Sequence, residues 1–104
     1  MPETLHNLVE LVEAWAHDRN IIAGLTPTQQ LPKLVEELGE LAGALIRNND
    51  PVIKDSIGDM LVVLTIMSAQ KGWSLRDCLE VSWHEIKDRK GIVRDGIFVK
   101  EADL

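Results

Sequence analysis

The fold is decided by residues 33–64, which read KLVEELGELAGALIRNNDPVIKDSIGDMLVVL. Apolar residues recur here every three or four positions, as they do along one face of an α-helix. The segment 48–51 interrupts this pattern, with Asp50 as the expected N-cap and Pro51 at the first helical position. We therefore predict an antiparallel pair of helices. The first is preceded by Thr28 or Leu31, has Pro32 in its first turn and ends at about Arg47, and the second runs from Pro51 to about Lys71.

A further helix is predicted on each side of this pair. Apolar residues at helical spacing predict a first helix from about residue 3 to residue 18. The following segment, Arg19 to Thr28, contains a glycine and a proline and is expected to be a loop of irregular turns. Ser74, with Asp77 three residues later, is expected to cap a last helix that ends near Gly91.

The C-terminal segment has a different pattern. The pair Asp95-Gly96 lies between two short runs of β-prone residues within 92–99, which predicts a small hairpin or an extended arm. The whole chain, residues 1–104, is accordingly expected to form one all-α domain of four helices with this short C-terminal appendage.

Composition excludes several classes of function. The 104 residues carry 11 basic and 17 acidic side chains, a net charge of −6, which disfavours nonspecific binding of nucleic acid and a polybasic membrane anchor. The longest apolar run, residues 60–69, is about half of the roughly 20 residues that span a bilayer. The single cysteine, Cys78, cannot form an internal disulfide, so we expect a cytoplasmic protein.

The predicted helix after Pro51 also bears on assembly. From Met60 onward it is apolar on nearly all sides, so it must be covered by several neighbours. A chain of about 100 residues has little material to provide that cover alone. We therefore expect a homo-oligomer.

Acidic residues cluster on both helices of the central pair. The carboxylates are Glu36, Glu37 and Glu40 on one helix and Asp55 and Asp59 on the other. Like charges three or four positions apart cost about 0.2–0.5 kcal/mol per pair in an isolated helix. If the clusters face each other across the pair, they need a cation, and carboxylate ligands without a His/Cys set favour Mg²⁺, with Mn²⁺ as a substitute. A solvated helix face is the alternative interpretation.

Other residues beside these clusters suggest a ligand. Gly39 and Gly58 are unfavourable in helices and suggest close helix approach or access for a ligand. Because Mg²⁺ usually completes its coordination with water and phosphate oxygens, a phosphate-containing substrate is expected. Four basic residues could contact it: Lys33, Lys87, Arg89 and Lys90. Trp15, next to the loop that begins at Arg19, could stack on a base or pack in the interior.

The paired acidic motifs resemble those of the MazG-type all-α nucleoside triphosphate pyrophosphohydrolases. That family carries Glu-x-x-Glu, a spacer and then Glu-x-x-Asp, and the segments 33–41 and 57–61 are similar to its pattern. The closing segments 85–91 and 96–101 resemble the small single-domain members of phages and bacteria. The resemblance implies an antiparallel four-helix bundle that forms dimers or dimer-of-dimers tetramers. It also implies Mg²⁺-dependent cleavage of (deoxy)nucleoside triphosphates between the α- and β-phosphates, which yields a monophosphate and pyrophosphate.

The resemblance also implies roles for individual residues. Glu37, Glu40 and Asp59 match metal ligands, whereas the family's third ligand falls on Ser56, so Asp55 is the expected substitute. His84 stands where close relatives often have an asparagine near the substrate. The catalytic residues expected are Glu36, which would orient or deprotonate water unless a ligand carboxylate does so, and Lys33 on the phosphates. The substrate-binding residues expected are Trp15, Arg19, His84, Lys87, Arg89 and Lys90. A noncatalytic oligomer that binds a nucleotide or a protein partner is the alternative, because Ser56 lacks a carboxylate.

Overall fold

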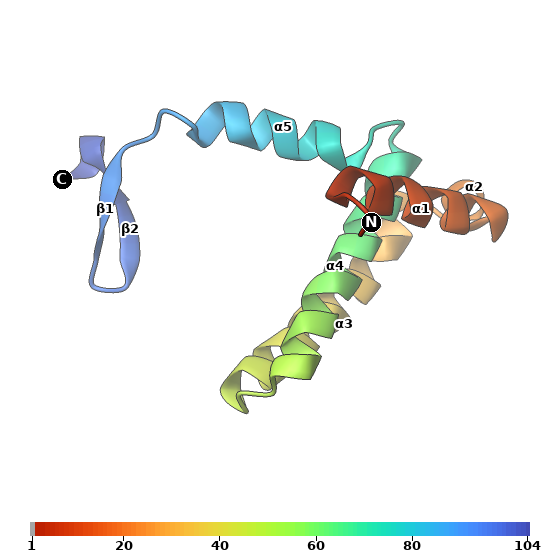
Figure 1. Ribbon diagram of the computed structural model, residues 1–104, viewed down its shortest axis with the longest axis horizontal. Helices are drawn as coiled ribbons and strands as arrows, with labels where there is room; N and C mark the ends of the chain where they lie inside the picture. Colours follow the sequence, from red (N-terminus) through yellow and green to blue (C-terminus); the bar gives the residue numbers. More distant parts are fainter. Residues whose placement is uncertain (1) are drawn as a thin grey trace.

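The computed structural model describes residues 2–104 and contains four long helices and a short C-terminal hairpin (Figure 1). In chain order the helices are α1 (Leu5–Asp18), α2 (Ile21–Gly24), α3 (Pro27–Ile46), α4 (Asp50–Gln70) and α5 (Leu75–Ile86). The antiparallel strands β1 (Gly91–Arg94) and β2 (Ile97–Lys100) follow, and a 3₁₀ turn, η1 (Glu101–Asp103), ends the chain. The predicted all-α fold with a C-terminal hairpin is confirmed.

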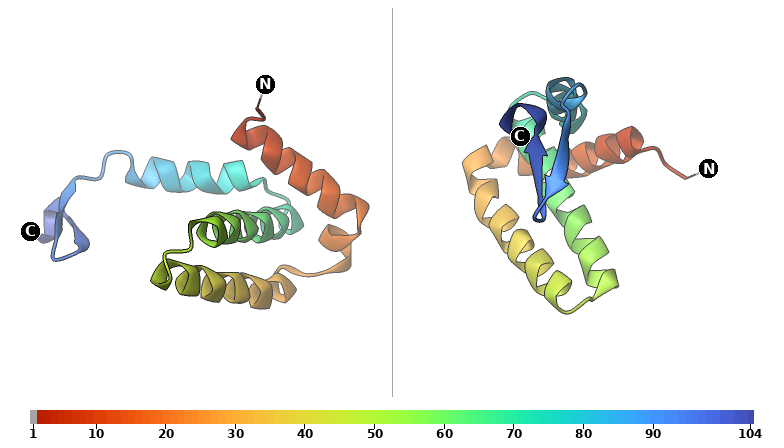
Figure 2. Two further views of the ribbon diagram at one scale, coloured as in Figure 1. Left: turned by 60° about the horizontal axis from the view of Figure 1, so that its bottom comes forward. Right: turned by 90° about the vertical axis from the view of Figure 1, so that its left-hand side faces the viewer.

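The antiparallel pair of α3 and α4 is the centre of the molecule (Figures 1 and 2). Helix α3 begins at Pro27, earlier than predicted, because Thr26 and Gln29 form a reciprocal capping box. Pro32 consequently lies in the second turn rather than in the first. The N-cap of α4 is Asn49 rather than Asp50, since the Asn49 side chain accepts a hydrogen bond from the Val52 amide at 3.4 Å.

Helices α1 and α2 pack against α4. Residues 19–28 are not a continuous loop as predicted, because they contain the one-turn helix α2, which follows Asn20 in a left-handed conformation (φ 57°). The Gln70 side chain at the end of α4 donates hydrogen bonds to the carbonyls of Leu25, at 2.9 Å, and Ile21, at 3.4 Å. These bonds tie the α2 segment to α4.

Helix α5 and the hairpin extend away from the α3–α4 pair as an arm, residues 75–104 (Figure 1). Ser74 and Asp77 form the predicted capping box, but α5 ends at Ile86 rather than near Gly91. Asp95 (φ 54°) and Gly96 (φ 76°) make the hairpin turn, as the Asp-Gly pair predicted. Helix α5 makes sparse contacts with α4 and α1, and β1 packs on β2 and η1.

The isolated chain is more open than a compact domain of its size. Its radius of gyration is 16.5 Å, whereas about 13 Å is typical of a compact domain of 104 residues. Its accessible surface is 7904 Å², whereas a monomer of this mass usually exposes about 5,800 Å². The buried apolar core is correspondingly small: Val9, Ala16, Ala44, Val63 and Ile66.

One part of the apolar surface that stays open lies on α3. Four apolar residues recur at helical spacing along this helix, and each is 50% or more exposed. They form an apolar stripe of Leu31, Val35, Leu38 and Leu45. Among the helices of residues 2–104, none is both long enough and apolar enough to span a bilayer.

Candidate functional site

The predicted acidic residues lie where the middle of α3 packs against the first half of α4. Glu37 faces into this contact and its side chain is only 4% exposed. Lys33, one turn earlier on α3, places Nζ 3.1 Å from Glu37 Oε1 and 3.6 Å from Glu36 Oε1. The second oxygen of Glu37, Oε2, is buried and has no hydrogen-bond partner. A buried carboxylate oxygen without a partner is unfavourable unless a donor or a cation reaches it.

Carboxylates from both helices influence one another at this site. The negative charge of Glu37 is the largest cause that raises the pKa of Glu40. Burial is the largest cause that raises the pKa of Asp59, and the charges of Asp55 and Glu37 raise it further. The hydrogen-bonded ion pair with Glu37 is the main cause that raises the pKa of Lys33. The cluster therefore carries more negative charge than Lys33 balances.

This donor set fits a hard divalent cation by its chemistry. Its ligand atoms are carboxylate oxygens, the type that Mg²⁺ and Mn²⁺ prefer, and one of them is the buried, unpartnered Oε2 of Glu37. Across residues 2–104, no three His, Cys, Asp or Glu side chains already converge as a preformed ligand set. Lys33 is instead the cation next to Glu37, so a metal ion would require the side chains to rearrange.

The position that departs from the family pattern lies inside the helix contact. Ser56 is 1% exposed, and its hydroxyl has no hydrogen-bond partner. Asp55, the expected substitute ligand, is exposed on α4 one turn before Asp59. Gly39 and Gly58 do not mark close helix approach, since a Cβ added at either would meet no atom within 4 Å. That part of the glycine interpretation is wrong, because both glycines border open space.

Two of the expected substrate-binding residues form a pair at the end of α1. The guanidinium of Arg19 lies 4.7 Å from the centre of the Trp15 ring, and Arg19 Nη1 donates a 3.1 Å hydrogen bond to the Trp15 carbonyl. The Trp15 residue is 45% exposed, so its ring is not enclosed by the interior. The arrangement leaves an aromatic face and a fixed positive charge at the surface.

The other expected substrate-binding residues lie on the arm. His84 is in the last turn of α5, and Lys87, Arg89 and Lys90 follow it before β1. All four are exposed, and none pairs with an acidic side chain within the part of the chain that the structure describes. Because the arm extends away from α3 and α4 (Figure 1), a single chain does not bring these residues to the acidic cluster.

A carboxylate that sequence reasoning missed is Glu13 on α1. One of its oxygens, Oε1, is buried without a hydrogen-bond partner. One face of α1 carries Val9, Val12, Glu13 and Ala16. Val9 and Val12 line a pocket together with Gly58 and Val62 of α4. A carboxylate within an apolar stripe was the available signal.

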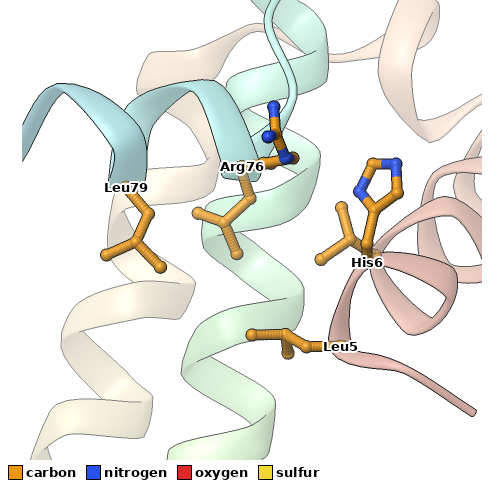
Figure 3. A pocket seen from close by; sticks show the side chains of 6 residues that line it. Leu5, His6, Arg76 and Leu79 are labelled. Carbon is orange, nitrogen blue, oxygen red and sulfur yellow. The ribbon is translucent and has the colours of Figure 1, made fainter. Parts of the chain in front are cut away.

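Figure 3 shows a pocket between the N-terminal turns of α1 and α5. Leu5, Val9, Leu75 and Leu79 line it, and His6 and Arg76 lie at its edge. His6 pairs with Glu10 at 2.9 Å and Arg76 with Glu80 at 3.2 Å, so both polar side chains already have partners. No sequence signal pointed to this pocket, because residues about 70 positions apart line its two sides.

The four long helices place this protein among the all-α proteins, and its acidic residues lie on two helices that pack together. Comparison with known families identifies which of these it is. A sequence model of the MazG nucleotide pyrophosphohydrolase domain matches residues 25–93, and the chain belongs to that family. The match includes the acidic cluster and the basic residues as far as Lys90 but not Trp15 or Arg19.

A phage protein is also similar to this chain. It is described as "Uncharacterized 18.2 kDa protein in rep-hol intergenic region" of Haemophilus phage HP1 and is 47% identical over 66 residues. Those residues make up 64% of this chain and 40% of the phage protein, so the chain spans well under half of that relative's length. No solved structure matches the chain significantly.

Proposed function

We propose that this protein hydrolyses (deoxy)nucleoside triphosphates between the α- and β-phosphates in the cytoplasm, with Mg²⁺ as the cofactor. The products would be a nucleoside monophosphate and pyrophosphate. The observation that carries the proposal is Glu37 Oε2, which is buried and unpartnered in the contact between α3 and α4, where the charge of Glu37 raises the pKa of Glu40, and burial together with the charge of Glu37 raises that of Asp59. Membership of the MazG family supports the same reaction class.

Each residue of the cluster has a role in this proposal. Glu37, Glu40 and Asp59 would hold Mg²⁺, with Asp55 in place of the carboxylate that Ser56 lacks. Mg²⁺ bound there would supply Lewis acidity towards phosphate oxygens and lower the pKa of a bound water. Glu36 is exposed beside the cluster and is available to orient a water molecule or accept its proton. Lys33 would offset negative charge on the phosphates.

A second copy of the chain completes the proposed site. A single chain leaves the apolar stripe of α3 exposed, namely Leu31, Val35, Leu38 and Leu45. Its accessible surface also exceeds that of a compact monomer of the same mass by about 2,000 Å². A standard interface buries about 800 Å² per partner, so this excess is sufficient for a homodimer or a dimer-of-dimers tetramer. Residues 87–94 carry four basic and one acidic side chain in a chain of net charge −6. We propose that this basic segment of one copy reaches the acidic cluster of another.

The experiment that tests the reaction compares pyrophosphate and orthophosphate release from a panel of ribo- and deoxyribonucleoside triphosphates, with and without Mg²⁺. Mg²⁺-dependent pyrophosphate release is the expected result, and the panel would identify the base and the sugar. Orthophosphate alone would place the cleavage at another bond and overturn the proposed reaction.

A noncatalytic role is the second candidate, and Ser56 is the observation that favours it. Its buried hydroxyl stands where the family has a metal ligand, and a hydroxyl does not supply a carboxylate's charge. In that case the chain would form the same oligomer and bind a nucleotide or a protein partner without turnover. Nucleotide binding by calorimetry, with no product over the whole panel, would favour this candidate.

A further inference from the structure

We propose that Lys33 is the resident counter-cation of the acidic cluster and competes with divalent metal for Glu37. This inference rests on the proposed function, because it concerns the same site. It adds that metal binding displaces the Lys33 ammonium from Glu37, so that Lys33 determines how tightly the site binds Mg²⁺.

The first step of the argument is the burial of Glu37. Its side chain is 4% exposed, and burying a carboxylate is costly unless a positive charge or several hydrogen bonds accompany it. Lys33 Nζ, 3.1 Å from Oε1, is the cation that pairs with it among the described residues. The Lys33 side chain therefore makes the buried carboxylate tolerable in the metal-free chain.

The second step is that a divalent ion and this ammonium exclude each other. The cation site proposed above needs the carboxylate of Glu37, one oxygen of which Lys33 already contacts. Two positive centres at the same carboxylate repel each other, and an ion that takes both oxygens of Glu37 displaces the ammonium from Oε1.

The third step is that Lys33 can leave at little cost. Its side chain is 54% exposed, in contrast to that of Glu37, and Glu36 at 3.6 Å is an exposed second partner. A lysine on a flexible four-carbon stem at the surface loses only a weak ion pair when it turns into solvent. Once released, the ammonium is free to contact a phosphate of the bound substrate.

The test measures metal affinity and stability of the full chain rather than turnover. The variant K33Q removes the charge, K33R keeps it, and K54Q removes one equal charge from an exposed lysine of α4 that forms no ion pair within residues 2–104. Mg²⁺ affinity is measured by calorimetry and Mn²⁺ affinity by the electron paramagnetic resonance of the free ion. Unfolding by urea is measured without metal.

We expect K33Q to bind Mg²⁺ and Mn²⁺ roughly three- to tenfold more tightly than the wild type, while its metal-free form unfolds at lower urea. K33R and K54Q should both resemble the wild type. If K33Q weakens metal binding, or if K33Q and K54Q change it equally, this inference would be overturned while the proposed reaction would stand. No divalent metal binding by the wild type would overturn both the inference and the metal-dependent reaction. Tighter binding by K33Q without any hydrolysis by the wild type would support the inference and overturn only the reaction.

Discussion

The side-chain amide of Gln70 donates a 2.9 Å hydrogen bond to the backbone carbonyl of Leu25, 45 positions earlier in the chain. This bond attaches the segment between α1 and α3 to the C-terminal end of α4. Substitution of Gln70 by Ala should therefore lower the free energy of unfolding by about 0.5–1.5 kcal/mol, since it removes this exposed bond and the longer, part-buried bond to the Ile21 carbonyl. Urea unfolding at one fixed protomer concentration measures this effect, with K54A on the exposed face of α4 as the control. Equal midpoints for the two variants would contradict the prediction.

The proposed metal ligands predict a loss of turnover without a loss of fold. E40Q should lower kcat/KM for the preferred triphosphate by about a hundredfold or more, equivalent to about 2.7 kcal/mol of transition-state stabilisation. Its circular dichroism and oligomer mass should match the wild type, because Glu40 is exposed and makes no structural ion pair with a described residue. E3Q, at an exposed glutamate before α1, is the control with the same chemical change. Unchanged turnover in E40Q would reject this metal site.

Asp55 is predicted to stand in for the carboxylate missing at Ser56. D55N should raise the Mg²⁺ concentration that gives half-maximal activity by about tenfold, with a smaller change in the rate at saturating Mg²⁺. D50N removes an acid from the first turn of the same helix and should leave the Mg²⁺ requirement unchanged. Equal Mg²⁺ curves for the wild type and D55N would show that Asp55 is not a ligand.

The repulsion within the cluster predicts a pH dependence of stability in the metal-free protein. The fold raises the pKa of Asp59 above its ordinary value, through burial and through the charges of Asp55 and Glu37. A raised carboxyl pKa means that the native state holds the proton more tightly than the unfolded state does. The stability that this group contributes is therefore complete below the ordinary carboxyl pKa of about 4 and is lost as pH rises through the raised value.

The variant D59N tests this sign. Without metal, D59N should be more stable than the wild type at pH 7, and the difference should shrink as pH falls towards 4. Urea midpoints measured at several pH values would show it, with D50N as a control that is expected to track the wild type. A D59N protein that is less stable than the wild type at pH 7 would reverse the predicted sign.

The proposed contribution of one copy's arm to another copy's site predicts complementation between inactive variants. E40Q disables the acidic cluster, and a triple variant, K87Q/R89Q/K90Q, removes the basic residues of the arm. If the arm acts on a second copy, an equal mixture that exchanges subunits should recover about a quarter of wild-type activity, because half of the dimers then contain one intact site. If both parts act within one chain, the mixture should stay inactive. Subunit exchange is checked by mass spectrometry of the mixed oligomers.

The sequence predicted the helices well where their signals are local. The 3.6-residue pattern located the four long helices, and the Ser74–Asp77 pair and the Asp95-Gly96 turn formed as predicted. The errors occur where two local signals compete. Pro27 was assigned to a loop, although it occupies the first turn of α3 after the Thr26 cap, and the short helix α2 has no periodicity because it is a single turn.

The candidate site was only partly accessible from sequence. The spacing of Glu37 and Glu40, with Asp59 one helix later, was sufficient to propose that they meet, because a short loop forces α3 and α4 to be antiparallel neighbours. The spacing did not reveal which of these carboxylates is buried. It also did not reveal that Gly39 and Gly58 border open space or that Glu13 has a buried carboxylate oxygen.

The sequence by itself thus determined the helical class, the central antiparallel pair and the hairpin, since these depend on periodicity, caps and turn residues within a few positions of one another. The tertiary structure decided that Glu37 is enclosed with Lys33 as its partner and that the basic residues of the arm lie away from the acidic cluster. It also left the apolar stripe of α3 uncovered. These properties depend on how segments far apart in the chain approach in space, and burial, charge pairing and exposed area exist only once that packing is formed.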